Sequence, residues 1–161
     1  MKAPAAPICP TCTAPPPARL TTGREVYPHR RDLHDKPIWK CDGCGGYVGC
    51  HPGTNNPLGT PADYKLRQAR MALHNSMIDP LWEGADTCGI YAPENEKAAR
   101  KIRGTARKRV YAYLGAQLGI EVDQVHVGMF DLETCRRAWV ALRGKTYADI
   151  RDWAKAQREA A

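Results

Sequence analysis

The pattern of hydrophobic and polar positions changes near residue 60. Before that point, short runs of alternating apolar and polar residues are separated by proline and glycine, which is typical of short β-strands. The strands predicted from this pattern are 19–21, 24–27, 38–41 and 47–50. The segment 51–60, H-P-G-T-N-N-P-L-G-T, is rich in turn-forming residues and predicts a boundary.

Beyond residue 60 the apolar residues recur at the spacing of an α-helix. Each predicted helix begins at a residue that can cap it, and most are followed by glycine or proline. The predicted helices are Thr60 to Pro80, Thr105 to Gly119, Asp131 to Gly144, and Thr146 onward. In the last of these, Asp149 completes a capping box with Thr146.

Four of the seven cysteines stand in two C-x-x-C pairs. Cys9 and Cys12 form C-P-T-C, and Cys41 and Cys44 belong to C-D-G-C-G. Each pair can supply two thiolates from one turn, and Zn²⁺ prefers four such ligands in a tetrahedron. A redox pair is disfavoured, because the thioredoxin-like motif occurs with a βαβ pattern that this sequence lacks. We expect one structural zinc ion and a reducing cytoplasm.

Other candidate ligands surround these pairs. Cys50 and His51 follow the second pair, and His29 and His34 lie between the pairs. They could replace a ligand or build a second metal site, although packing of Cys50 as a small hydrophobic residue is favoured. No role is predicted for the two remaining cysteines, Cys88 and Cys135.

Together these patterns predict an α+β protein with two domains. Residues 1–60 form a zinc ribbon of short antiparallel strands with a proline-rich N-terminal arm, in which Pro15 to Pro17 are consecutive. Residues 61–161 form a small helical domain. Each half is near the size at which an apolar core alone is marginal. Zinc is expected to stabilise the ribbon, since it contributes roughly 10–16 kcal/mol in zinc-finger peptides.

The composition is that of a globular protein, with 43% apolar and 25% charged residues. No apolar run reaches the length of about 18 residues that a membrane span needs. The N-terminal sequence M-K-A-P-A-A-P-I-C-P has no apolar segment of the kind found in signal peptides. We therefore expect a protein that stays in the cytoplasm and has no membrane partner.

The formal net charge of +7 favours acidic partners such as nucleic acid. Lys and Arg concentrate between residues 97 and 109, where no acidic residue occurs. The predicted phosphate contacts are Arg30, Arg31, Lys97, Arg100, Lys101, Arg103, Arg107, Lys108 and Arg109. A solvated helix face is the alternative explanation for such a basic run. The favoured function is an accessory or regulatory protein that binds DNA or RNA with little sequence preference, because such cations contact phosphates rather than bases.

Two other classes of function remain open. A protein–protein adaptor, or an inhibitor that docks on a host enzyme, would expose aromatic anchors such as Trp39, Tyr47 or Trp82. A metal-dependent nuclease would use the histidines near the cysteine pairs. The nuclease is disfavoured, because a four-cysteine zinc site is closed and no acid–base pair falls on one element. We therefore expect no enzymatic activity.

Six segments carry a further pattern: C-P-T-C, G-R-E-V-Y-P-H-R, C-D-G-C-G-G-Y-V-G-C-H, P-L-G-T, D-P-L-W and H-V-G-M-F-D-L-E-T-C-R-R. In these segments, from about Cys9 to Arg137, the chain resembles a family of small zinc-finger-containing proteins of bacteriophages and bacteria. The resemblance implies a zinc site at the four paired cysteines and a bacterial or phage-infected cytoplasm. It implies no reaction. The basic run and the helix after Gly144 are not assigned to the family pattern.

Overall fold

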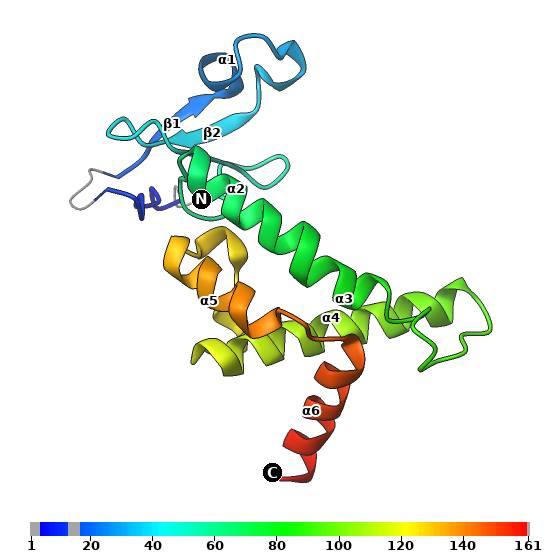
Figure 1. Cartoon of the computed structure of the whole chain (residues 1–161). Helices are drawn as coiled ribbons and strands as arrows, with labels where there is room; N and C mark the ends of the chain where they lie inside the picture. Colours follow the sequence, from blue (N-terminus) through cyan, green and yellow to red (C-terminus); the bar gives the residue numbers. More distant parts are fainter. Residues whose placement is uncertain (1–3, 13–16, 161) are drawn as a thin grey trace. The chain divides into compact units, whose positions relative to one another are not determined.

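A computed structural model gives the fold and describes residues 4–12 and 17–160 (Figure 1). The chain divides into two compact units. Unit 1 contains Met1–Ala69 and His126–Asp131, and unit 2 contains Arg70–Val125 and Leu132–Ala161. A small antiparallel sheet near the N-terminus precedes the helices, so the predicted α+β class is confirmed. The domain boundary at residue 60 stays a prediction, and Pro15 and Pro16 of the arm lie outside the described residues.

Unit 1 is built on a sheet in which β2 is the middle strand. Its strands are β1 (Arg19–Thr22), β2 (Pro37–Lys40) and β3 (Tyr47–Gly49). Trp39 of β2 pairs with Leu20 on one side and Val48 on the other. Ile38 and Trp39 are buried, and the indole N–H of Trp39 donates to the Asn55 carbonyl oxygen at 2.8 Å. Three of the four predicted strands are confirmed, and their buried core is small.

The fourth predicted strand, 24–27, is wrong. The chain forms α1 (Gly23–Val26) there, a single helical turn in which the N–H of Tyr27 donates to the Gly23 carbonyl at 2.7 Å. A Cβ at residue 23 would overlap the carbonyl oxygen of Leu33, in the short 3₁₀ turn η1 (Arg31–Leu33). This close backbone approach turns the chain away from the sheet, and an alternating local pattern cannot reveal it.

A second segment, distant in sequence, also belongs to unit 1. The 3₁₀ turn η4 (Val127–Met129) packs against the turn-rich segment that follows β3. The backbone N–H of Thr60 donates to the Gly128 carbonyl at 2.9 Å. A Cβ at Gly59 would overlap the backbone of Gly128. The two segments can approach this closely because neither residue has a side chain.

Helix α4 is central to unit 2, where it contacts α3, α5, α6 and the short turn η3. The elements of unit 2 are α3 (Asp79–Glu83), α4 (Glu96–Leu118), η3 (Val122–Gln124), α5 (Leu132–Leu142) and α6 (Tyr147–Glu159). α2 (Tyr64–Leu73) begins in unit 1 and ends in unit 2. Fully buried Leu114, Leu142 and Ile150 come from three of these helices and form part of the core. No helix among the described residues is long and apolar enough to cross a membrane.

The first predicted helix continues past Pro80. Between α2 and α3 lies a π-helical turn, η2 (His74–Ile78). Proline has no N–H to donate, and in an α-helix its ring would clash with the carbonyl four residues earlier, here that of Ser76. The wider turn just before Pro80 lets the helix continue to the end of α3.

Two predicted helix starts are wrong. The first helix is capped by Asp63 rather than Thr60, since the Asp63 carboxylate accepts the backbone N–H of Leu66 at 2.8 Å. α4 begins after its N-cap Asn95, and Thr105 lies in its interior. The intervening Lys, Arg and Ala residues are good helix formers, so the basic run and the apolar stripe belong to one helix.

The predicted ends of the second and third helices and the cap of the fourth are confirmed. Gly119 and Gly144, each with φ of 72°, follow α4 and α5 in the left-handed conformation that favours glycine. Thr146 caps α6, and the Thr146 and Asp149 side chains each accept the backbone N–H of the other residue. This capping box fixes the start of α6.

Candidate functional site

Four cysteine sulfurs meet in unit 1. The Sγ atoms of Cys9, Cys12, Cys41 and Cys44 all lie within 4.8 Å of one another. Cys9 and Cys44 are 3.5 Å apart, and Cys12 and Cys41 are 3.6 Å apart. Zn–S bonds of about 2.3 Å in a regular tetrahedron place the sulfurs about 3.8 Å apart. The arrangement therefore fits one structural zinc ion bound by these four residues.

Backbone hydrogen bonds shape the turn that carries the second pair. The N–H of Cys41 donates to the Gly46 carbonyl at 2.7 Å, and the N–H of Gly45 donates to the Cys41 carbonyl at 2.9 Å. Gly45 has φ of 72°, a conformation that glycine adopts without strain. The N–H of Gly46 then donates to the Cys44 sulfur at 3.4 Å, as expected around a zinc-bound thiolate.

Contacts with the sheet hold both turns in place. The N–H of Ala18 donates to the Pro7 carbonyl at 2.9 Å and fixes the N-terminal arm beside β1. The Arg19 guanidinium binds the Asp42 carboxylate through two hydrogen bonds of 2.9 and 3.0 Å and also pairs with Glu25. Hydrogen bonds from Arg19 hold the pKa of both carboxyl groups below their usual values. The pairs are exposed, so they position the turn more than they stabilise it.

The environment of the four thiols favours a bound cation. Cys9 and Cys41 are buried, whereas Cys44 is exposed. Hydrogen bonds with the thiols of Cys41 and Cys44 raise the pKa of Cys12 to about 12. Burial raises the pKa of Cys41, but backbone N–H groups of Cys44 and Gly43 outweigh it and lower that pKa to about 7. Four thiolates this close repel one another, and Zn²⁺ at their centre removes that repulsion.

The other candidate ligands do not join this site. Within residues 4–12 and 17–160, the four cysteines are the one group of three or more Cys, His, Asp or Glu that could hold a metal. Burial raises the pKa of the half-buried Cys50 thiol. His34 Nε2 lies 3.1 Å from the Pro28 carbonyl oxygen, and His29 and His51 are exposed. The nuclease alternative gains no support from their positions.

The two arginines predicted as contacts in the ribbon differ in their surroundings. Arg30 forms a two-pronged pair with Asp32 at 2.7 and 2.9 Å, and this pairing lowers the pKa of the carboxyl group. Arg31 is exposed at the start of η1. Both belong to unit 1, whereas the basic run belongs to unit 2. Asp32 therefore compensates the charge of Arg30. Arg31 does not pair with Asp32.

The basic run presents four cations on the exposed face of α4, which we call the α4 stripe. Its members are Lys97, Arg100, Lys101 and Lys108. The three lysines are spaced at positions i, i+4 and i+11, so they follow one line along the helix for about 16 Å. Among the described residues none of the four forms an ion pair, and the opposite face, with Ala106 and Val110, is buried.

The other cations of the run have partners within unit 2. Arg103 forms an ion pair of 2.6 Å with the buried Asp86. The Arg107 guanidinium lies over the rings of Trp82 and Tyr111, 5.5 and 5.6 Å from their centroids. Arg109, the last of the run, is half-buried and contacts two tyrosines. The structure thus separates the seven cations into the four of the α4 stripe and three that contact side chains of unit 2, of which Arg107 is itself exposed.

Aromatic residues predicted as adaptor anchors are engaged inside their own units. Trp39 is 7% exposed. Tyr47 is half-buried, with the Arg67 guanidinium 4.0 Å from its ring centroid. The Trp82 indole N–H donates to the Asp79 carboxylate at 3.1 Å. The adaptor alternative stays a prediction without support from these side chains.

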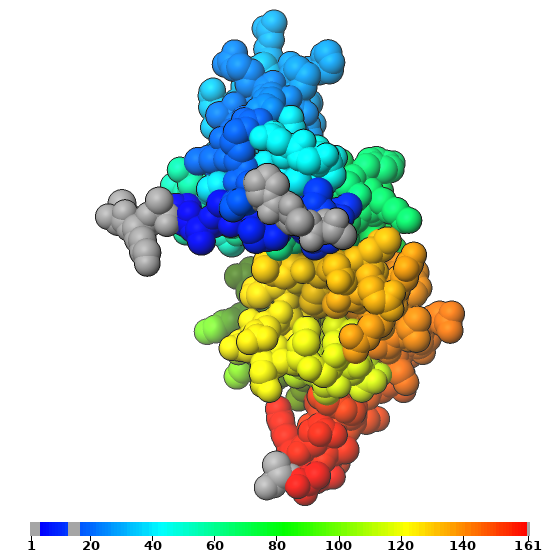
Figure 2. Space-filling model, turned by 90° about the vertical axis from the view of Figure 1, so that its left-hand side faces the viewer, coloured from blue at the N-terminus to red at the C-terminus, as the bar shows by residue number. Residues whose placement is uncertain are grey.

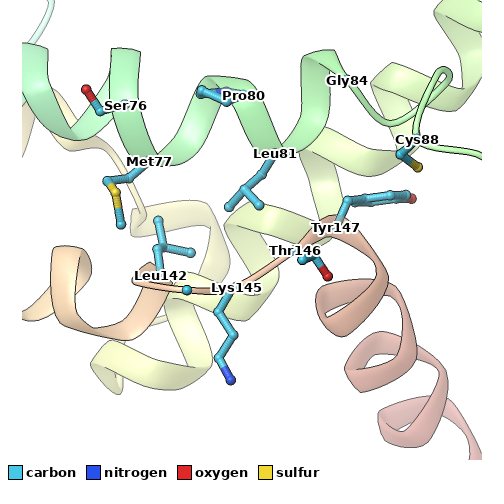
Figure 3. A pocket seen from close by; sticks show the side chains of 11 residues that line it. Ser76, Met77, Pro80, Leu81, Gly84, Cys88, Leu142, Lys145, Thr146 and Tyr147 are labelled. Carbon is cyan, nitrogen blue, oxygen red and sulfur yellow. The ribbon is translucent and has the colours of Figure 1, made fainter.

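A hollow of about 350 Å³ in unit 2 lies beside the η2–α3 segment (Figure 3). Met77 and Leu81 point towards Leu142, and the rest of the lining is largely apolar or uncharged. Lys145 is the single charged residue among its described lining residues. The hollow therefore lacks the paired acid and base that a hydrolytic site needs.

The sheet and the four sulfurs define a zinc ribbon, a class of zinc finger in which the metal is structural because all four positions are filled by cysteine. The family model of a zinc-finger-containing domain matches residues 5–145, and the chain belongs to this family. Searches of curated proteins and of solved structures found no match. The predicted family resemblance and the single structural zinc ion are thereby confirmed.

Proposed function

We propose that the protein binds nucleic acid through the α4 stripe and catalyses no reaction. The observation that carries this proposal is the set of four exposed cations that form no ion pair with any described residue, Lys97, Arg100, Lys101 and Lys108, on one face of a long helix. The opposite face of α4 packs against α3, α5 and α6, so the helix is anchored and its charges stand in a fixed line. A fixed line of cations suits the regularly spaced phosphates of a nucleic acid.

The chemistry of the stripe favours binding without base reading. Lys and Arg side chains of this kind neutralise phosphates, which carry no sequence information. Arg103 is excluded from the proposed surface, because Asp86 already compensates its charge. The zinc ion supports the ribbon rather than a reaction, since a four-cysteine site leaves no position for water or substrate. Among the described residues that line the hollow beside α3, no acid–base pair occurs.

Charge reversal within the stripe tests the proposal. The variant Lys97→Glu, Arg100→Glu, Lys108→Glu changes the net charge from +7 to +1 and leaves the buried face of α4 intact. Lowering the salt from 1 M to 0.1 M strengthens duplex binding by about 0.9 log unit for each phosphate that the protein neutralises. The loss of three phosphate-binding cations should therefore weaken binding roughly 10²-fold or more at 0.1 M salt. Fluorescence anisotropy with a labelled 20-base-pair duplex measures the change.

A matched control separates the stripe from net charge. The variant Arg136→Glu, Arg143→Glu, Lys145→Glu makes the same change in charge on other exposed residues of unit 2. We expect it to weaken duplex binding much less than the stripe variant. Equal losses in the two variants would show that only the overall charge matters, and the proposal for α4 would be wrong.

A further inference from the structure

Two hollows of unit 2 share a single side chain, Arg109. The larger has a volume of about 490 Å³ and is lined by Arg109 of α4 and by Arg151, Asp152, Lys155 and Arg158 of α6. The smaller, about 310 Å³, has an aromatic and apolar lining that includes Tyr91, Tyr147, Ala98 and Ile102. Lys101, a member of the α4 stripe, also lines the smaller hollow. Both volumes fall within the range of about 300–1,000 Å³ that is usual for small-molecule sites.

Arg109 is a cation held by neutral partners. Its guanidinium donates to the hydroxyl oxygens of Tyr147 at 2.8 Å and Tyr91 at 3.1 Å. Its Nε is buried and has no acceptor, and among the described residues no carboxylate pairs with it. Arg103, one turn and a half earlier on α4, has Asp86 instead. A half-buried charge without an opposite charge is costly, and an anion in the adjoining hollow would remove that cost.

The larger hollow is strongly cationic. Its lining contains four cations and one carboxylate, which gives a charge of +3. Arg151 pairs with its neighbour Asp152 at 2.7 Å, and Lys155 has a longer, exposed contact of 3.8 Å with Glu159. Arg158 forms no ion pair among the described residues. The three α6 cations are spaced at i, i+4 and i+7, so they share one helix face. Lys155 and Arg158 are exposed and Arg151 is half-buried, in the C-terminal segment that Figure 2 colours red.

The smaller hollow offers a platform for a ring. Tyr91 is half-buried, and its hydroxyl is bound to Arg109, so the ring is fixed beside the cationic hollow. Ile102 and Ala98 supply apolar contacts, and Lys101 adds a charge. Aromatic rings next to a cationic groove are the arrangement with which proteins bind single strands, because bases stack on the rings while phosphates contact the cations. A duplex keeps its bases inside and cannot use such a platform.

We infer that the two hollows form one nucleotide-binding site that gives the protein a preference for single-stranded nucleic acid. A base stacks on Tyr91 in the smaller hollow, and the adjoining phosphate contacts Arg109 and the α6 cations in the larger one. The inference rests on the proposed function for the class of ligand, but only Lys101 is shared with the α4 stripe. α6 follows the residues that the family model matches, which end at residue 145.

The test compares a labelled 20-nucleotide oligo(dT) with a duplex of equal length by fluorescence anisotropy. The variant Tyr91→Leu removes the ring, and it should weaken single-strand binding roughly 5- to 150-fold, the usual effect of losing one stacked base, while duplex binding changes little. Tyr64→Leu is the matched control, because Tyr64 is 72% exposed and lies far from α4 in sequence. It should leave both ligands unaffected.

A second variant tests the same site in case Tyr91→Leu does not fold. Lys155→Glu, Arg158→Glu changes only exposed residues of α6 and should make the slope of log affinity against log salt for the single strand shallower by about 1.4. Arg136→Glu, Arg143→Glu is the charge-matched control.

The outcomes separate this inference from the function proposed for α4. If the α6 variant leaves single-strand binding unchanged, or weakens the two ligands equally, the nucleotide site is wrong. If the stripe variant loses duplex binding in the same assay, the α4 proposal still stands. If the stripe variant binds both ligands normally and the α6 variant loses the single strand, the nucleotide site stands alone. No binding of either ligand by the wild-type protein overturns both.

Discussion

Two glycines of α4 should respond in opposite ways to the same substitution. Gly104 lies in the interior of the helix and is exposed, and an added Cβ would meet nothing within 4 Å. Glycine in a helix interior costs roughly 0.8–1.0 kcal/mol relative to alanine. Gly104→Ala is therefore expected to raise the free energy of unfolding of unit 2 by about 0.8–1 kcal/mol. For a unit of this size, about 1 kcal/mol corresponds to a rise in Tm of roughly 4–8 °C.

Gly115 is the matched control on the same helix. It is buried, and a Cβ there would lie 2.8 Å from the carbonyl oxygen of Ile120 and 3.2 Å from a methyl carbon of Val125. The carbonyl belongs to the backbone and cannot move aside without displacing the segment that follows α4. The clash should outweigh the gain in helix propensity, so Gly115→Ala is expected to lower stability by about 1–3 kcal/mol, as in other overpacked cores.

Urea unfolding with zinc present, followed by circular dichroism at 222 nm, measures both variants. We expect the midpoint to rise for Gly104→Ala and to fall for Gly115→Ala, with unchanged slopes of the free energy against urea concentration. A fall in the midpoint for Gly104→Ala would show that the exposed glycine has a structural role that its surroundings do not reveal. A rise for Gly115→Ala would mean that its contacts with Ile120 and Val125 are looser than described.

Two further predictions concern the ribbon and α6. Metal analysis should find one zinc per chain, and Cys41→Ser should expose Trp39, with a red shift of the summed tryptophan fluorescence, while most of the helical circular dichroism is retained. A total loss of helical signal would contradict a separate unit 2. Thr146→Ala should destabilise unit 2 by about 1 kcal/mol in urea unfolding, because the capping box with Asp149 is removed. An unchanged urea midpoint would mean that α6 does not need this cap.

The sequence predicted the ligands of the metal site because the information within each C-x-x-C pair is local. Each C-x-x-C pair specifies its own turn, and Gly45 supplies the conformation that the second turn needs. Thr146 and Asp149 specified the start of α6 in the same way. Features of this kind depend on residues a few positions apart, and a single sequence displays them directly.

Contacts between distant residues account for what the sequence missed. The strand expected at 24–27 is absent because the backbone of Gly23 approaches Leu33. The basic run was one set of seven equivalent cations in the sequence, but Asp86 and Tyr147, both outside the run, engage two of them. The α6 cations were missed altogether, although their i, i+4, i+7 spacing was a signal that could have found them.

The salt dependence of duplex binding by the wild-type protein tests the role of α4 most directly. Four stripe cations in contact with phosphates predict a slope of log affinity against log salt of about −3.6, at roughly 0.9 per phosphate. The stripe variant, which keeps only Lys101, should show a slope near −0.9 by the same relation. A wild-type slope near zero, or the same slope in both proteins, would contradict the proposal that α4 binds nucleic acid.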